Sequence, residues 1–431
     1  MASFRERYAR GEIDKREFGE KDRGLGKQRG RESGEWRLEM DAERKNVALL
    51  SACQALLFTN SVTLIAINGL AGYALAADKG LATLPVTAQV IGSALATIPA
   101  SLVMQRIGRR AGFQIGSGFG LAGGAISTLA IASSSFWLLC FGTLILGVYG
   151  AFGLYYRFAA ADSAGGEFKA KAISLVLAGG LVGGLVGPTL SRWTRDLAQP
   201  EFLASYASLM VFSLISMAVL SRLQIPRGKE DEAMAPPRSL GGIMAQPTFI
   251  VAVTLSAIGY GVMSLLMTAT PLAMGFGGHP YSAAATVISW HVIAMFAPSL
   301  VTGSLIERFG LLSVVLTGVA IMFVCVATAL AGVTVKHFWL ALVLLGVGWN
   351  FMYVGGTTLL TGAYSPSEKA KTQGMHDFLV FGVTIVSSFS SGLLLKANGW
   401  QMLNYVAIPF LTVAGLACLW MMLRTKRTIA A

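Results

Sequence analysis

Apolar residues fill nearly every position between 46 and 424, and the runs break only at short clusters of charged residues, glycine and proline. A bilayer core is about 30 Å thick, so a helix that crosses it needs about 20 mostly apolar residues. Because lipid offers the backbone no water, each long run is predicted to be a helix. The twelve runs are 47–76, 83–105, 111–132, 135–160, 171–191, 203–223, 248–275, 282–306, 311–333, 337–363, 374–396 and 401–424. The pattern predicts an all-α polytopic membrane protein.

Composition supports this class. Only 13% of the residues are charged and the mean hydropathy is +0.62, whereas about 25% are charged in an average soluble domain. The cysteines lie inside predicted spans without a CxxC pair, so we interpret them as small buried apolar residues; they are Cys53, Cys140, Cys325 and Cys418. The polar first 45 residues lack the apolar region of a cleavable signal peptide.

The basic residues indicate orientation. With a cytoplasmic N terminus, 16 of the Lys and Arg residues after position 45 fall on the cytoplasmic side and 5 on the other. Such an excess in short loops is the positive-inside signature. We therefore expect both termini in the cytoplasm, in a bacterial-type inner membrane. Orientation and contact with anionic membrane lipid account for the net charge of +12, so no nucleic-acid partner is expected.

Five segments follow from these patterns: a charged tail at 1–45, a six-helix bundle at 46–223, a linker at 224–247, a second bundle at 248–424 and a tail at 425–431. Residues 5–25 can form short amphipathic helical turns. They look like a bacterial oligomerisation motif, which makes them a candidate partner-binding segment. Residues 24–34, rich in Gly, Arg and Lys, are expected to be a flexible linker. A disordered tail of mixed charge is the alternative.

Two short patterns recur about 200 residues later in the chain. An Arg-x-Gly pattern at 106–108 recurs at 308–310, an offset of 202, and Lys-Ala-Lys at 169–171 recurs at 369–371, an offset of 200. A shared offset predicts a six-helix unit duplicated in parallel. One large class of transporters builds alternating access from such repeats.

These loops resemble the signature of the major facilitator superfamily, G-x-x-x-D-R-x-G-R-R between spans 2 and 3. Ser101 replaces the first Gly and Gln105 replaces the Asp, while Glu307 keeps the acid in the second copy. The resemblance covers about residues 46–427. It implies a secondary transporter with twelve transmembrane helices in two pseudo-symmetric six-helix bundles.

The resemblance also implies that the span 2–3 loop is a cytoplasmic latch against span 11. Gly108 would permit its tight turn, and its arginines would seek a carboxylate, for which Asp377 is available at a helix start. The alternative is that these arginines only set topology. The predicted gating residues are Arg106, Gly108, Arg109, Arg110, Glu307, Arg308, Gly310 and Asp377.

Polar and aromatic side chains inside the spans are the candidate substrate contacts. The resemblance implies that spans 1, 4, 7 and 10 surround a central cavity, where aromatic walls would suit a flat or amphipathic ligand. The alternatives are ordinary interhelical hydrogen bonds, aromatic packing, and for Arg157 a helix-end anchor paired with Asp162 or Glu307. The predicted substrate-binding residues are Asn350, Tyr353, Trp349, Arg157, Tyr156, Ser61 and Tyr260.

Proton coupling has two candidates. His291 lies near mid-depth of span 8, where a histidine can change charge near neutral pH, and Asp162 ends span 4. The alternative for His291 is a neutral ring bonded to a backbone carbonyl. In span 5, Gly183-x-x-x-Gly187-Pro188 resembles the motif of members that export by antiport, with Ser174 where a glycine is usual.

The sequence lacks a P-loop, a nucleophile with its base and His or acidic clusters at metal spacing, so we expect no enzymatic activity, cofactor or metal. It favours proton-linked export of a small amphipathic or aromatic organic solute. One alternative is uptake of a nutrient or vitamin, since some bacterial facilitators of similar appearance are proposed flavin carriers. Another is a membrane scaffold or sensor that acts through its N-terminal tail.

Overall fold

The computed structural model describes residues 15–163, 168–225 and 238–430, without the side chains of 15–41, 161–162, 168–171, 173–174, 177, 366, 369–370 and 426–430. Within these ranges the secondary structure is entirely helical, which confirms the predicted all-α fold. The helices of the first half are α2 (Lys15–Leu75), α3 (Leu84–Ile107), α4 (Arg109–Ala132), α5 (Phe136–Gly153), α6 (Tyr156–Ser163), α7 (Phe168–Thr194) and α8 (Leu203–Leu220), with a 3-10 turn η1 (Lys79–Leu81).

The second half follows the linker. Its elements are α9 (Leu240–Met244), α10 (Pro247–Phe276), α11 (Tyr281–Phe296), α12 (Ser299–Phe309), α13 (Leu311–Ala331), α14 (Val335–Leu360), η2 (Thr361–Ala363), η3 (Pro366–Glu368) and α15 (Lys369–Ala430). α11 and α12 are one predicted span bent by 42°. α15 contains two predicted spans, because Gly399 breaks the helix with φ 73° and ψ −174°.

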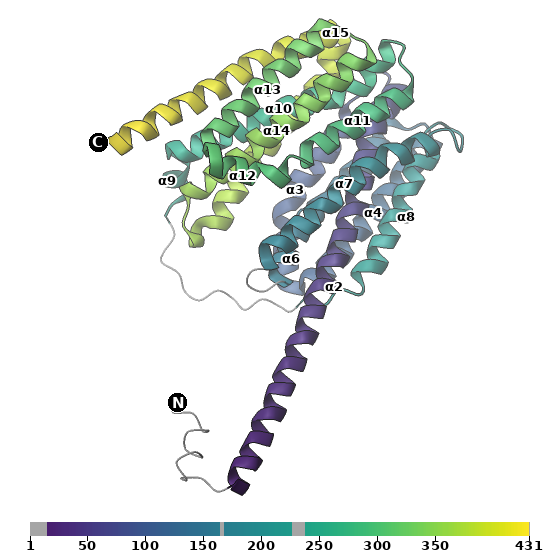
Figure 1. Cartoon of the computed structure of the whole chain (residues 1–431). Helices are drawn as coiled ribbons and strands as arrows, with labels where there is room; N and C mark the ends of the chain where they lie inside the picture. Colours follow the sequence, from purple (N-terminus) through teal and green to yellow (C-terminus); the bar gives the residue numbers. More distant parts are fainter. Residues whose placement is uncertain (1–14, 164–167, 226–237, 431) are drawn as a thin grey trace.

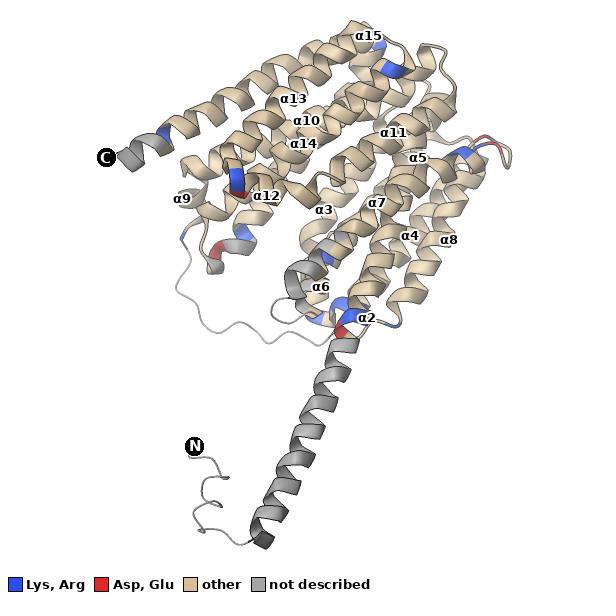
Figure 2. Ribbon diagram, viewed as in Figure 1, with Lys and Arg blue, Asp and Glu red and all other residues tan. Residues whose placement is uncertain are grey.

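The helices are long enough to cross a bilayer. Nine in the described part of the chain have the length and apolar composition, or ten if α11 and α12 count as one span. One of the nine, Lys371–Thr425, has 55 residues, about 80 Å of helix and more than twice a bilayer core. Figure 2 shows the described charged residues gathered near the helix ends. A multi-pass membrane protein is confirmed, whereas the count of twelve spans stays a prediction.

Helix packing repeats between the two halves. α2 packs on α7 as α10 packs on α15, α3 on α5 as α11 on α14, and α4 on α5 as α13 on α14. Between the halves, α7 meets α11 and α3 meets α15, and exchanging the halves converts one contact into the other. Figure 1 shows the two bundles side by side. The predicted pair of pseudo-symmetric bundles is therefore confirmed.

Two equivalent glycines make the turns between paired helices. Gly108 joins α3 to α4 with φ 91°, and Gly310 joins α12 to α13 with φ 86°. A residue with a Cβ is strained at such positive φ values. The repeated motif thus has a backbone reason to keep glycine at both positions.

The glycines of α7 bring this helix close to α2. A Cβ on Gly183 would lie 2.4 Å from the Cβ of Phe58, and one on Gly179 would lie 2.4 Å from the carbonyl oxygen of Ser51. Small residues allow helices in lipid to pack at short range. Close packing accounts for this motif without reference to the direction of transport.

The two halves are joined at one end of the bundles, which we call the closed end. The Tyr281 hydroxyl donates to Ser191 Oγ at 2.7 Å, and Ser388 Oγ donates to Thr87 Oγ1 at 3.1 Å. Lys396 forms an ion pair with Asp78, which lowers the pKa of the Asp78 carboxyl. At the opposite linker end, which carries α6 and α9, the bundles diverge in Figure 1.

The tail differs from its prediction. The helical backbone of α2 begins at Lys15 and runs without a break to Leu75, so residues 24–34 lie within a helix instead of a flexible linker. The five Arg, Lys, Glu and Gln residues of this segment have high intrinsic helix propensities, whereas its four glycines oppose a helix. Residues 5–14 of the proposed oligomerisation segment lie outside the described part of the chain.

The linker is anchored by one ion pair. Arg238 donates from Nε to Glu368 Oε1 at 2.8 Å and from Nη2 to Glu368 Oε2 at 2.7 Å, and its backbone N–H donates to the same carboxylate at 2.8 Å. These donors, with the Ser365 N–H, hold the pKa of Glu368 far below its ordinary value. The anchor fastens the start of α9 to the loop between α14 and α15.

Replacing Glu368 with glutamine is expected to loosen this anchor. Because the folded state lowers the pKa of the carboxyl, docking is stabilised above the ordinary glutamate pKa of about 4.3 and weakens as pH falls through that value. The variant should therefore expose the linker to trypsin at pH 7 faster than the parent does. Glu307→Gln removes an exposed acid and is the control; equal digestion rates in both variants would contradict the assignment.

Candidate functional site

An aromatic cluster lies between α10 and α14. Trp349 and Tyr353 are one helical turn apart, and their rings stack with centroids 5.1 Å apart and planes inclined by 11°. Tyr260 meets both edge to face, at 5.5 Å from Trp349 and 5.4 Å from Tyr353. Such geometries suit the ring quadrupoles. Three predicted substrate contacts are thus brought together.

The cluster continues into the first half of the chain. Phe296, at the end of α11, lies edge to face with Trp349 at 6.2 Å. Phe58 of α2 meets Phe296 at 5.0 Å. α2, α10, α11 and α14 therefore contribute to one aromatic surface that bridges the halves.

Three polar groups of this cluster have no hydrogen-bond partner among the described residues. Trp349 is only 5% exposed, yet its indole Nε1 has no hydrogen-bond partner among the described residues. Tyr260 and Tyr353 are half-buried, and neither hydroxyl bonds to another described residue. Buried polar groups in folded proteins nearly always have partners. An occupant with hydrogen-bond acceptors would satisfy the indole.

Arg157 lies at the start of α6, in the first half of the chain. The helix of span 4 breaks between α5 and α6, at Leu154 and Tyr155, just before this residue. The half-buried Arg157 guanidinium lies 4.8 Å from the Phe158 ring centroid, and its Nε has no hydrogen-bond partner in the described structure. Its charge contributes to the electrostatic potential at the Tyr260 and Tyr353 phenols.

Asp377 provides the opposite charge from α15. It lies 2.9 Å from Nδ1 of its neighbour His376, which is 1% exposed and whose Nε2 has no partner among the described residues. The Asp377 charge also acts on the phenols of Tyr260 and Tyr353. An arginine from one half and a carboxylate from the other therefore both contribute to the electrostatic potential at the same tyrosines.

Asn350 supports the bend between α11 and α12. Its amide donates to the carbonyl of Met295 at 2.7 Å and to Ser299 Oγ at 2.6 Å, and its oxygen accepts from Thr302 Oγ1 at 2.7 Å. Pro298 at this bend has no N–H for the helix ladder, so nearby carbonyls need other donors. All three bonds stay within the second half, and we propose support of the bend as its role.

The variant Asn350→Leu is expected to destabilise the fold. It leaves buried polar groups of the bend without partners, which costs about 1 to 3 kcal/mol per group. The thermal unfolding midpoint in detergent should fall clearly below that of Thr357→Val, because the Thr357 hydroxyl bonds only within its own helix. Equal midpoints for the two variants would contradict a structural role.

The other predicted site residues lie elsewhere. His291 is fully buried between α11 and α14, with Nδ1 2.8 Å from the carbonyl oxygen of Leu342. Tyr156 is fully buried in the first half, edge to face with Phe113 at 4.8 Å. Ser61 is half-buried on α2. The side chain of Asp162 lies outside the described structure.

The predicted latch residues lie at the linker end. Arg106, Arg110, Glu307 and Arg308 are exposed. Arg109 is half-buried, 6.0 Å from the ring of Tyr155. Among the described residues, no ion pair joins Asp377 to Arg106 or Arg110. The latch stays a prediction for a state in which the halves approach at this end.

Two pseudo-symmetric helical bundles, joined at one end and facing each other across a polar and aromatic site, define the class of alternating-access membrane transporters. Comparison with known proteins agrees. The profile of the Major Facilitator Superfamily matches residues 48–297 and 278–430. The chain belongs to this superfamily.

Its relatives include a transporter with a named substrate. The chain is 40% identical over 393 residues to the riboflavin transporter RfnT of Brucella anthropi, covering 90% of this chain and 98% of that protein. It is 30% identical over 365 residues to the uncharacterised transporter YddS of Bacillus subtilis, covering 79% and 82%. The nucleoside transporter NupG has the same fold, with a TM-score of 0.68 and 16% identity, over 87% of this chain and 99% of that one.

Sequence reasoning missed three parts of this site. His376 stands beside Asp377 in the sequence, and no motif or spacing distinguishes it there. Phe58 and Phe296 look like ordinary apolar residues of their spans. Only their approach across the interface between the halves distinguishes them.

Proposed function

We propose that the chain carries riboflavin, or a flat heterocycle very similar to it, into the cell. The observation that supports this most directly is the stacked pair Trp349 and Tyr353 with its unpartnered indole N–H. The 40% identity to a riboflavin transporter over nearly the whole chain supports the same substrate class. The protein acts as a carrier and catalyses no chemical change.

The chemistry of the substrate matches the site. The isoalloxazine ring of riboflavin is planar and tricyclic, and stacking on an aromatic side chain contributes about 1 to 3 kcal/mol per ring system in comparable base–aromatic contacts. Its carbonyl groups accept hydrogen bonds of the kind that Trp349 Nε1 offers. The ribityl hydroxyls suit charged and phenolic partners such as Arg157 and Tyr260. Because riboflavin is neutral at pH 7, Arg157 and Asp377 are free to attract each other across the site.

We also propose that His376 and Asp377 couple transport to protons. The half-exposed Asp377 carboxylate is reachable from solvent, while His376 is buried behind it. Protonation would remove the attraction between Asp377 in one half and Arg157 in the other, and thereby change the balance between open and closed arrangements. Other groups facing the pair are Tyr155, Tyr260 and Tyr353.

The proton gradient would supply the free energy for uptake. A proton that enters down a membrane potential of 100 mV releases about 2.3 kcal/mol. Such a gradient can accumulate a neutral vitamin at low external concentration. We place the chain in the cytoplasmic membrane with both termini inside, as the basic residues of its loops favour.

Purified protein in liposomes tests this function. With an inward proton gradient, riboflavin should accumulate inside, and the increase should disappear when an uncoupler collapses the gradient. Uridine, a nucleoside without the tricyclic ring, is the control solute. Loss of preloaded riboflavin under an inward gradient would favour export by antiport. Absence of any riboflavin flux, with a functional orientation shown by another solute, would reject the substrate.

A further inference from the structure

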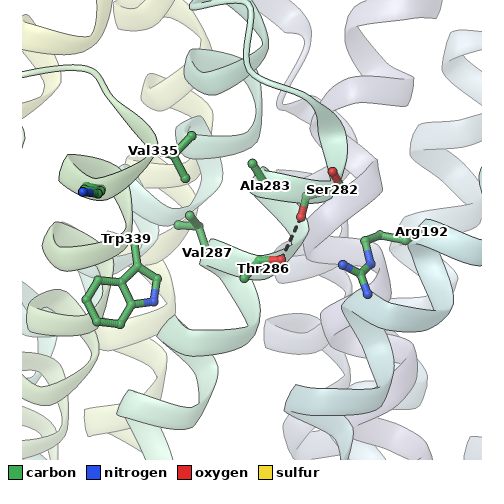
Figure 3. A pocket seen from close by; sticks show the side chains of 8 residues that line it. Arg192, Ser282, Ala283, Thr286, Val287, Val335 and Trp339 are labelled. Carbon is green, nitrogen blue, oxygen red and sulfur yellow. Dashed lines mark hydrogen bonds between the residues drawn. The ribbon is translucent and has the colours of Figure 1, made fainter.

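A pocket of about 330 Å³ lies at the closed end, on the seam between the two halves. Figure 3 shows Arg192 of α7 on one side, Trp339 of α14 on the other, and Ser282 and Thr286 of α11 between them. Val287 and Val335 complete an apolar wall. The pocket is distinct from the aromatic cluster, since they share no residue.

The pocket lies at the level expected for lipid headgroups. Arg192 is in the last turn of α7, Ser282 in the first turn of α11 and Lys336 in the first turn of α14. Tryptophans gather at membrane–water interfaces, where their rings lie at headgroup depth. Exposed tryptophans occur around this end of the bundles: Trp137, Trp193 and Trp339, at 68%, 74% and 37%.

The two cations of the pocket lack the anionic partners that two other cations at the closed end have. Arg195 pairs with Glu201, and Lys396 pairs with Asp78. Lys79 at this end forms no ion pair with a described residue, but its Nζ donates to the Tyr73 carbonyl at 2.6 Å. Arg192 and Lys336 line the pocket, and neither has an anionic partner in the described structure.

The position of Lys336 in the first turn of α14 would also be stabilised by a nearby anion. A cation in the first turn of a helix is opposed by the positive end of the helix dipole. A phosphate placed between Lys336 and Arg192 would reverse this effect at α14. The Thr286 hydroxyl donates to the Ser282 carbonyl at 2.8 Å, whereas the Ser282 hydroxyl has no bond to another described residue and can donate to a phosphate oxygen.

We propose that this pocket binds an anionic phospholipid. The phosphate lies between Arg192 and Lys336, and an acyl chain follows the apolar wall past Val287 and Trp339. Because Arg192 belongs to the first half and Lys336 to the second, the lipid bridges the seam. It reinforces the contact of Tyr281 with Ser191 and favours the state with this end closed.

The test uses the full-length protein in nanodiscs of phosphatidylcholine, with and without phosphatidylglycerol. Phosphatidylglycerol should raise the thermal unfolding midpoint of the parent, and native mass spectrometry should detect it as a retained lipid. Arg192→Gln with Lys336→Gln should lose both effects. Arg110→Gln with Arg222→Gln removes the same charge at the linker end and should keep them.

Further variants separate binding of a whole phospholipid in the pocket from a general effect of charge. Ala283→Leu narrows the pocket with both charges intact and should also weaken lipid retention, even if the charge variant proves unstable. Lys336→Arg should retain it. An unchanged phosphatidylglycerol effect in the double glutamine variant, or equal stabilisation of the parent by inorganic phosphate, would overturn the proposal. Neither outcome depends on riboflavin transport, so the two proposals can fail separately.

Discussion

Trp349→Ala is expected to weaken riboflavin binding by about 5- to 150-fold, which corresponds to the loss of roughly 1 to 3 kcal/mol of stacking. The indole stacks on Tyr353 and offers the only described buried N–H of the aromatic cluster that lacks a partner. Riboflavin fluorescence is quenched when its ring stacks on an aromatic side chain. A quenching titration of purified protein therefore measures both the affinity and the contact.

Two further variants sharpen this result. Trp349→Phe keeps an aromatic face but removes the N–H donor, so its affinity should lie between those of the parent and the alanine variant. Trp137→Ala removes an exposed tryptophan of α5 and should leave the affinity unchanged. If Trp349→Ala and Trp137→Ala bind riboflavin equally well, the aromatic cluster is not the site.

Asp377→Asn is expected to abolish proton-driven accumulation of riboflavin while leaving exchange intact. The amide keeps the size of the carboxylate but cannot take up a proton, so a pH gradient no longer does work on the carrier. Exchange of labelled for unlabelled riboflavin across the membrane needs only the movement of loaded carrier. The expected result is therefore equilibration without accumulation.

Exchange also separates coupling from the predicted latch. If Asp377 acts chiefly as a latch partner of Arg109, then Asp377→Asn should slow exchange as much as it slows net uptake. His376→Gln removes the ring whose Nδ1 lies 2.9 Å from the Asp377 carboxylate and should weaken proton-driven accumulation. Full accumulation by Asp377→Asn would eliminate this pair as the coupling site. Asp196→Asn makes the same change at an exposed acid of the closed end, outside the predicted latch and the aromatic site.

The sequence was sufficient to predict the architecture, because its strongest signals are physical necessities. Long apolar runs must be helices in lipid. The repeated loops predict equivalent turns in the two halves, and these turns are present at Gly108 and Gly310, both with positive φ. The number of spans does not equal the number of helical elements, because α15 holds two predicted spans separated by the kink at Gly399.

The site was predictable only in part. Spacing places Trp349, Asn350 and Tyr353 within a broad arc of one helix, but it does not say which neighbour each side chain meets. That depends on the bend of α11 and α12 at Pro298, where the Asn350 amide donates to the Met295 carbonyl. The spacing of residues within α14 cannot indicate that a different helix bends next to it. The aromatic stack was accordingly predictable, and the structural use of Asn350 was not.

The buried cysteines have a practical consequence for measuring motion. Cys53, Cys140, Cys325 and Cys418 are each at most 8% exposed, so thiol reagents in water should react with them slowly. Spin labels could then be attached to cysteines introduced at the exposed positions 106 and 307 without replacing the native cysteines first. Pulsed spectroscopy of that pair would measure directly how far the two linker-end surfaces separate during a transport cycle.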